Sequence, residues 1–243
     1  MYHLKLLGCV GLEGPRGTLD GPAVQPRRMA CLALLDSSRH RGMSREKILG
    51  FLWPDDDTAR ASHHLSDSLY GLKKTLGAEA IVAVGPSLRL NPDVIRSDVS
   101  EFHEALERGD LKHAVQIYAG PLLDGFYIRD TNGFGYWAER ERQRLAACQS
   151  VALTALATDS RESGDLTTSA GWWKRLVNQD PFSARAVAGL MKALEDSGES
   201  AKALLASREY QTRLMSELGM EPCPALLALA DDIRQRNDHP EHT

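Results

Sequence analysis

The side chains best suited to contact nucleic acid lie in residues 57–77, with the sequence DTARASHHLSDSLYGLKKTLG. Imidazole, carboxylate and phenol groups offer the donors and acceptors that the edges of base pairs require, and ammonium and guanidinium groups bind phosphates. The residues concerned are Arg60, His63, His64, Asp67, Tyr70, Lys73 and Lys74. An ordinary surface helix has a similar polar face, so this segment alone leaves both interpretations open.

The spacing of the less polar residues predicts that this segment is one amphipathic helix. They recur at helical intervals and form one stripe: Thr58, Ser62, Leu65, Leu69, Leu72 and Leu76. At about 100° per residue the opposite side contains Arg60, His63, His64, Asp67, Gly71 and Lys74, flanked by Tyr70 and Lys73. Asp57 or Thr58 is the predicted N-cap, and Gly77 is placed to end the helix.

The residues around this helix predict a small domain of helices and strands. Apolar residues alternate over residues 2–12, which predicts a half-buried strand, and GPRG at 14–17 predicts a turn before a short returning strand at 18–20. Residues 27–35 predict a buried helix with polar ends, and Ser44 is the predicted N-cap of a helix that Pro54 stops. Residues 81–84 and 88–90 predict a hairpin. A strand pair, three helices and a hairpin form a winged helix-turn-helix.

The second half of the chain predicts a helical repeat. GDLTTSAGWWKRLVNQDP begins at Gly164 and GESAKALLASREYQTRL begins at Gly198, an offset of 34 residues, which is the length of a tetratricopeptide unit. Ser169 and Ala203 each follow the glycine by five positions, where two helices approach closely. Gly109 marks an earlier, irregular copy, so we expect about three helix pairs. The predicted fold is mainly α: a winged helix-turn-helix (α+β) in residues 1–98 and an all-α tetratricopeptide-like domain in residues 99–243.

Composition agrees with a globular, reduced, cytoplasmic protein. No apolar run approaches the roughly 20 residues that cross a bilayer, and the four cysteines have no paired spacing. The net charge of −4 conceals an asymmetry. Residues 1–98 contain 13 Lys and Arg against 11 Asp and Glu, whereas residues 99–243 contain 16 against 22. The N-terminal half therefore has the balance better suited to a polyanion, by a small margin, which favours an oligomer or a helper protein.

The motifs of enzymes and metal sites are missing from the sequence, and we expect no catalytic residue, no metal and no cofactor. No Gly-Lys dipeptide or HExxH motif is present. His63 and His64 are adjacent, which is not the spacing for a shared metal on a helix, and residues 55–57 suit a helix-capping linker better than a cation site. Trp172 and Trp173 are at spacings typical of packing residues, although a ligand platform stays open. Arg140, Arg142 and Arg144 alternate with glutamates, which favours a solvated or interdomain face over phosphate binding.

An ordered set of short motifs resembles the Streptomyces antibiotic regulatory protein (SARP) family. In the first half they are LLG at 6–8, SREKIL at 44–49, LWPD at 52–55, LYGLKKTLG at 69–77 and SLRL at 87–90. In the second half they are GPLLDGF at 120–126, WAERER at 137–142, DPFSARA at 180–186 and ELGMEPCP at 217–224. The second set is similar to the bacterial transcriptional activator domain of that family. Position 71 is Gly, where the resemblance often places a basic side chain.

The resemblance implies a bacterial transcriptional regulator, an activator that binds direct-repeat promoter elements. The third helix would enter the major groove of double-stranded DNA, and Arg89 in the hairpin would contact phosphate or the minor groove. The helical domain would mediate a homodimer or higher oligomer and contact with RNA polymerase. The alternative is a tetratricopeptide-like adaptor whose winged helix has little DNA affinity, which the weak charge of residues 1–98 and Gly71 support. The operator, the target genes, any effector and any longer natural chain lie beyond what the sequence predicts.

Overall fold

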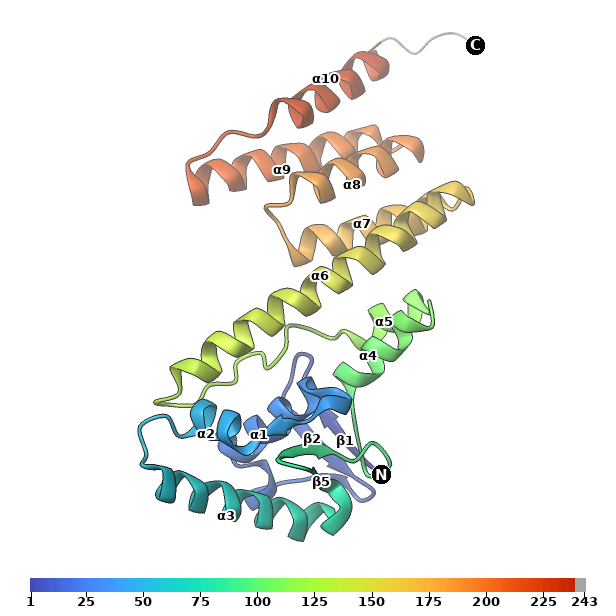
Figure 1. The fold of residues 1–243 in the computed structure, drawn as a ribbon. Coiled ribbons are helices and arrows are strands. Elements are labelled where there is room, and N and C mark those ends of the chain that lie inside the picture. The colour runs from blue at the N-terminus through green and yellow to red at the C-terminus, as the bar shows by residue number, and fades with distance from the viewer. Residues whose placement is uncertain (239–243) are drawn as a thin grey trace. The chain divides into compact units, whose positions relative to one another are not determined.

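The structure is a computed structural model and describes residues 1–238 (Figure 1). The chain divides into two compact units, Met1–Gln149 and Ser150–Thr243, and helix α6 (Asn132–Glu162) belongs in part to each. The N-terminal unit mixes strands with helices, and the second unit is helical throughout its described part. The predicted mainly α fold, with a mixed region followed by an all-helical region, is confirmed.

A four-stranded sheet begins the N-terminal unit. Its order is β3 (Gly17–Thr18), β2 (Gly11–Gly14), β1 (Tyr2–Lys5) and β7 (Ile95–Ser97). β1 pairs antiparallel with β2 and parallel with β7. The prediction of one strand over residues 2–12 is wrong, because the chain leaves the sheet after Lys5 and turns at Gly8, whose φ of 82° is unfavourable for other residues.

Three helices follow, and their ends confirm the predicted caps. They are α1 (Pro26–Ser37), α2 (Arg45–Leu52) and α3 (Thr58–Leu76), with 3₁₀ turns at Gly21–Val24 (η1) and Arg39–Arg41 (η2). The Ser44 side chain accepts from the amide of Lys47 at 3.3 Å, and Asp57 accepts from the amide of Arg60 at 2.9 Å. Gly77 ends α3 with a φ of 100°.

The predicted hairpin forms beside these helices. β5 (Ile81–Val84) follows the turn η3 (Ala78–Ala80) and pairs antiparallel with β6 (Ser87–Leu90). A short strand that the sequence did not reveal, β4 (Met43–Ser44), adds to the other edge of β6. α3 and a three-stranded wing are therefore held on the same small core.

The buried stripe of α3 is shifted from the prediction. Thr58 and Ser62 are exposed, whereas Ala61 and Ser68 are buried together with Leu65, Leu69, Leu72 and Leu76. Burial of Ser68 costs little because its hydroxyl donates to the carbonyl oxygen of His64 at 2.8 Å. The phase of the stripe follows Ala61 because its small side chain fits against the core.

The core of the N-terminal unit continues beyond residue 98. The carboxylate of Asp98 accepts from backbone amides just where the chain leaves β1: Oδ1 and Oδ2 both lie 2.9 Å from the amide of Leu6, and Oδ2 lies 2.9 Å from that of Leu7. Phe102, in α4 (Asp98–Glu107), is fully buried in the same cluster as Leu4. The shared core and the division at Gln149 describe packing. They do not test whether DNA binding is confined to residues 1–98, so the predicted domain boundary at residue 98 stays a prediction.

Two motifs that are far apart in the sequence meet in this unit. The amide of Leu123 donates to the carbonyl of Leu6 at 2.7 Å, and the amide of Gly8 donates to that of Pro121 at 2.9 Å. A Cβ atom on Gly120 would lie 3.1 Å from Cα of Gly8, so the two backbones approach closely. The LLG and GPLL motifs therefore form one backbone contact.

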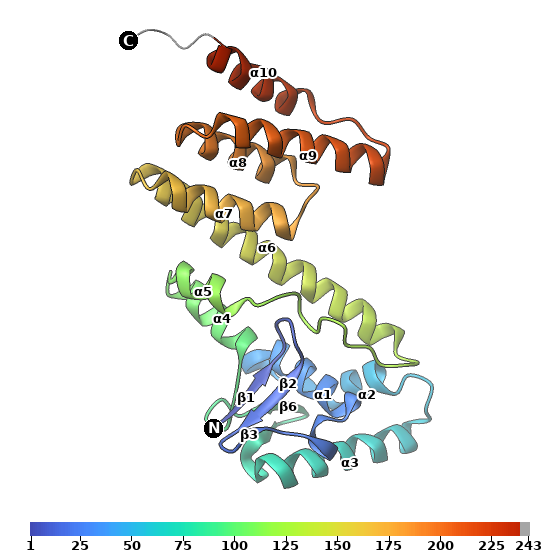
Figure 2. The same ribbon diagram turned by 180° about the vertical axis from the view of Figure 1, so that it is seen from behind.

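The helical region repeats one turn geometry. α4 and α5 (Leu111–Ile117) meet at Gly109, α6 and α7 (Leu166–Gln179) at Gly164, and α8 (Ala184–Asp196) and α9 (Ser200–Leu218) at Gly198. Each glycine has a φ between 73° and 81°, and the amide after it donates to a carbonyl five residues back. Ser169 and Ala203 are fully buried, as the repeat predicted. α10 (Pro224–Asp238) packs against α9 (Figure 2).

Candidate nucleic-acid interface

The outer face of α3 is open to solvent. α3 lies along the outer edge of the N-terminal unit in both views (Figures 1 and 2). Arg60, His63, Asp67, Lys73 and Lys74 are all exposed. The large side chain of Tyr70 is 70% exposed, which is unusual for an aromatic residue that only packs in a core. The structure thus brings these six predicted residues together on one helix, with His64 half-buried beside them.

Carboxylates partly neutralise the first half of this face. Asp56 lies 3.6 Å from Nε of Arg60 and 3.6 Å from Nε2 of His64, and Asp67 lies 3.4 Å from Nε2 of His63. The ring of His64 also stacks on Trp53 of the preceding turn, with centroids 6.1 Å apart. These exposed pairs are weak, so a phosphate that approaches can compete for Arg60.

The second half of the face has uncompensated positive charge. Lys73 and Lys74 form no ion pair with any residue of the described chain. Their position in the last turn also suits the negative end of the helix dipole. The ammonium groups are therefore available for an external anion.

Arg89 does not join this face. It lines a hollow of about 340 Å³ together with residues of α1, η2, β7 and α4, among them Asp36, Arg39 and Arg96, and no residue of α3 lines it. Its Nε atom is buried and has no hydrogen-bond partner within residues 1–238. The wing thus points this arginine toward α1, and its predicted contact with phosphate or the minor groove stays a prediction.

The same hollow contains a buried carboxylic acid. Asp36 is 7% exposed and accepts from the hydroxyls of Ser97 at 2.6 Å and Ser100 at 3.1 Å. Burial raises the pKa of Asp36 from 3.8 to about 6, against the opposite effect of the two serines. The group is a structural acid at the end of α1 and lies outside the outer face of α3.

Two arginines at the start of α1 contact the other two helices of this unit: Arg27 contacts the end of α2, and Arg28 contacts α3. Nε of Arg27 donates to the carbonyl of Leu52 at 3.3 Å, and its guanidinium lies 5.9 Å from the ring centre of Trp53. The guanidinium of Arg28 covers Gly71 in the middle of α3. The sequence contains both partners of this contact, a single glycine within α3 and the Arg27-Arg28 dipeptide. They are too far apart in the chain for a local pattern to show that they meet.

Residues 1–238 have neither a cluster suited to a metal ion nor a helix suited to cross a membrane. Residues 1–238 contain no group of three His, Cys, Asp or Glu side chains arranged to hold a metal ion. The four cysteines are free. No helix among these residues combines the length and apolar character needed to span a bilayer.

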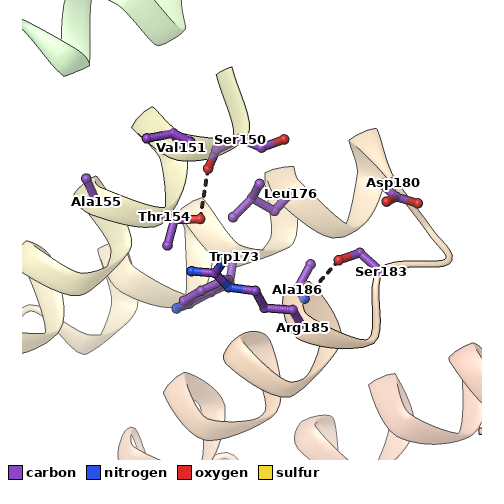
Figure 3. A pocket seen from close by; sticks show the side chains of 10 residues that line it. All are labelled: Ser150, Val151, Thr154, Ala155, Trp173, Leu176, Asp180, Ser183, Arg185 and Ala186. Carbon is purple, nitrogen blue, oxygen red and sulfur yellow. Dashed lines mark hydrogen bonds between the residues drawn. The ribbon is translucent and has the colours of Figure 1, made fainter. Parts of the chain in front are cut away.

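The helical unit has a hollow of its own. About 480 Å³ in volume, it is lined by Val151 and Thr154 of α6, Trp173 of α7, and Arg185 and Ala186 of α8 (Figure 3). Val151 is 71% exposed and Arg185 is exposed, so an apolar and a charged side chain both face solvent here. Such a surface suits a protein segment better than a nucleic acid.

Comparisons with known proteins assign this arrangement to a family. The family model of the bacterial transcriptional activator domain matches residues 95–234. The chain is 26% identical over 247 residues to the transcriptional regulatory protein EmbR of Mycobacterium tuberculosis, across 92% of this chain and 62% of EmbR. It is 26% identical to the regulatory protein AfsR of Streptomyces coelicolor, across 93% of this chain and 24% of AfsR. The chain therefore spans less than two thirds of either relative's length.

A further relative and a solved structure agree. The transcriptional regulatory protein MoaR1 of Mycobacterium tuberculosis is 24% identical over 87% of this chain and 73% of its own length. The structure of Mycobacterium tuberculosis EmbR in complex with a low affinity phosphopeptide superposes with a TM-score of 0.70 at 23% identity, covering 97% of this chain and 65% of that one, which supports the fold. The chain therefore belongs to the bacterial transcriptional activator domain family, whose SARP-type members are transcriptional regulators and not enzymes.

Proposed function

We propose that this chain is a sequence-specific DNA-binding regulator whose α3 enters the major groove. The observation that supports this best is the exposed outer face of α3, where hydrogen-bonding side chains lie next to lysines without carboxylate partners. A helix of 19 residues is about 28 Å long, which is long enough to lie in the major groove of DNA. Base edges would be contacted by His63, His64, Asp67 and Tyr70, and phosphates by Arg60, Lys73 and Lys74.

The experiment is a titration of the full chain with fluorescent duplexes, measured by anisotropy at several salt concentrations. A cognate duplex is first selected from a random pool and is compared with a scrambled one. Lys73→Ala and Lys74→Ala should weaken binding to both duplexes and lower the salt slope by roughly 0.9 for each lost phosphate contact. Asp67→Ala should relax preference at one base pair by about 1–3 kcal/mol, since a carboxylate accepts from cytosine N4.

A matched control separates these effects from a change of net charge. Lys112 is exposed on α5, which lies at the opposite end of the N-terminal unit from α3 in both views. Lys112→Ala should leave both affinity and salt slope unchanged. Equal losses for Lys73→Ala and Lys112→Ala would contradict a role for α3.

The remaining functional assignments are proposals that extend the family membership. We assign DNA binding to residues 1–98 and partner contacts to residues 99–243. We further propose that the chain activates transcription from direct repeats, contacts RNA polymerase and is located in the cytoplasm.

A duplex with two direct repeats should bind two chains cooperatively, and sedimentation velocity measures this. If the two repeats bind their chains independently, the proposal that the chains associate on DNA is wrong. Fragment 1–149 preserves the core cluster that includes Phe102, and it should bind a single repeat.

A second candidate function is that of an adaptor for protein partners, with little DNA affinity. The hollow beside Trp173 favours it, because apolar and charged side chains both face solvent there. The DNA titration discriminates between the two functions. If no duplex from the random pool is retained and random DNA shows no salt-dependent binding, the adaptor is the better description.

A further inference from the structure

Gly71 of α3 has no side chain, and the space beside it is occupied by a side chain of helix α1. Gly71 lies on the same side of α3 as Asp67 and Lys74. A Cβ atom added there would lie 2.4 Å from Cζ and from Nη2 of Arg28, closer than any real contact. The guanidinium of α1 thus occupies the place where a side chain at position 71 would begin.

Arg28 is held in this place but not neutralised. Its Nη1 donates to the carbonyl oxygen of Pro22 at 2.6 Å, in the turn η1, which packs against both α1 and α3. It forms no ion pair within the described residues. A guanidinium has five N–H donors, so the hydrogen bond to Pro22 leaves most of them for another acceptor.

The position of Gly71 around α3 complements that of Lys73. Residues two apart on a helix point about 200° apart, so Gly71 and Lys73 lie on the two flanks of the outer face. A helix in the major groove has a phosphate backbone on each side, and cations on both flanks can contact both backbones. Lys73 supplies the cation on one flank, and on the other flank α3 has glycine covered by Arg28.

We propose that Arg28 is a DNA-phosphate-binding residue and that Gly71 is required because it leaves room for the Arg28 guanidinium on α3. The binding surface is then built from two helices, with the charge of one flank supplied by α1. This inference rests on the proposed DNA-binding function. A different reading of the same contact makes Arg28 only a packing residue between α1, η1 and α3, and the two readings differ in what they predict for binding.

Three variants of the full chain test the proposal by the anisotropy titration described above. Arg28→Ala should weaken binding to cognate and scrambled duplexes alike by about tenfold and lower the salt slope by roughly 0.9. Gly71→Ala retains Arg28 but pushes its guanidinium off α3, so affinity should fall several-fold while the melting temperature stays equal or rises. Arg28→Ala combined with Gly71→Arg returns a cation to the same flank from α3 itself, and should recover most of the lost affinity.

The outcomes separate the inference from the proposed function. If Lys73→Ala weakens binding and Arg28→Ala matches the Lys112→Ala control, Arg28 is a packing residue and DNA binding stands. If wild type and all variants fail to bind any duplex, DNA binding itself fails. If Arg28→Ala also lowers the melting temperature, its loss of affinity no longer distinguishes phosphate binding from packing. In that case the affinities of Gly71→Ala and of the double variant decide between the two roles of Arg28. Full affinity in Gly71→Ala, or no recovery in a folded double variant, overturns the inference.

Discussion

Two helices of this molecule contain a glycine that is covered by a large side chain from a neighbouring helix. In α3, the guanidinium of Arg28 lies 2.4 Å from the place of a Cβ on Gly71. In α8, the indole of Trp173 lies 2.4–2.6 Å from the place of a Cβ on Gly189. The local geometry is the same, but the covering groups differ in charge, rigidity and surroundings.

The difference shows that a helix glycine serves two unrelated purposes. Arg28 is the flexible end of a side chain at a solvent-exposed edge, and it can move aside when Gly71 is substituted. Trp173 is a rigid ring at the packing contact between α7 and α8, next to the buried Leu176. We therefore expect substitutions in α8 to change stability and those in α3 to change binding.

The largest expected effect is the loss of the indole. Trp173→Ala should lower the free energy of unfolding by about 2–4 kcal/mol, below the cost for a fully buried tryptophan because the ring is half-buried. Arg28→Ala should change it by less than ~0.5 kcal/mol, as is usual at a surface. Urea denaturation of both variants measures the two changes in the free energy of unfolding. Similar losses in both variants would contradict the proposed difference between the two helices.

A second effect compares the two ends of α1, which has a charged Arg28 near its exposed start and Asp36 near its buried end. The pKa of Asp36 is raised from 3.8 to about 6 by burial, so the folded chain holds this proton more tightly than the unfolded chain. The associated stabilisation is complete below a pH of about 4 and is lost as the pH rises through about 6. Wild type should therefore lose about 2–3 kcal/mol from this group between those limits.

Asp36→Asn should remove that dependence, because the amide oxygen still accepts from Ser97 and Ser100 and never ionises. The measurement is urea denaturation at a series of pH values. Asp93→Asn is the matched control, since Asp93 is exposed and lines the same hollow. If wild type and Asp36→Asn share one pH profile, the carboxylate is not buried as described.

Substitution of Gly189 should have a smaller effect than loss of the ring it supports. Gly189→Ala forces Trp173 to shift, which costs more than the helix propensity gained, and we expect a net loss of about 1–2 kcal/mol. Gly171 is the matched control, because it lies in α7 with nothing within 4 Å of an added Cβ. Gly171→Ala should be neutral or stabilising, and a loss equal to that of Gly189→Ala would argue against the packing role of Trp173.

The smallest effect should have the opposite sign. Gly71→Ala exchanges glycine for the best helix former and displaces only a flexible guanidinium, so the chain should gain up to ~1 kcal/mol of stability. Thermal denaturation followed by circular dichroism measures this gain. A loss of more than ~1 kcal/mol would mean that Arg28 cannot move aside, and that the two glycines are alike.

The elements with local signals were predictable from the sequence. Ser44, Asp57 and Gly77 fix helix ends through short-range hydrogen bonds and backbone conformation, so their positions followed directly. The repeated turns at Gly164 and Gly198 were predictable for the same reason. Tetratricopeptide-like pairing then required Ser169 and Ala203 to be buried, which the structure bears out.

Features that depend on distant parts of the chain were not predictable. β7 has three residues and pairs with β1 across the whole domain, so it leaves no local pattern. The docking of Leu123 on Leu6 uses backbone atoms, which have no sequence signature. At the candidate site the exposed residues of α3 followed from helical periodicity. Arg28 was missed because its contact with Gly71 joins two helices, and the position of Arg89 was missed because a hairpin pattern does not show which neighbour a side chain meets.

The parallel pairing of β1 with β7 has a consequence for the order in which the chain folds during synthesis. The antiparallel partner β2 is made within a few residues of β1, but the other edge of β1 waits for Ile95–Ser97 and for the Asp98 carboxylate that accepts the amides of Leu6 and Leu7. Until the ribosome has released these residues, the first strand has an open edge that another nascent chain can pair with. Closing so long a loop is slow, so α1, α2 and α3 should assemble first and the first strand of the chain should be among the last to be completed.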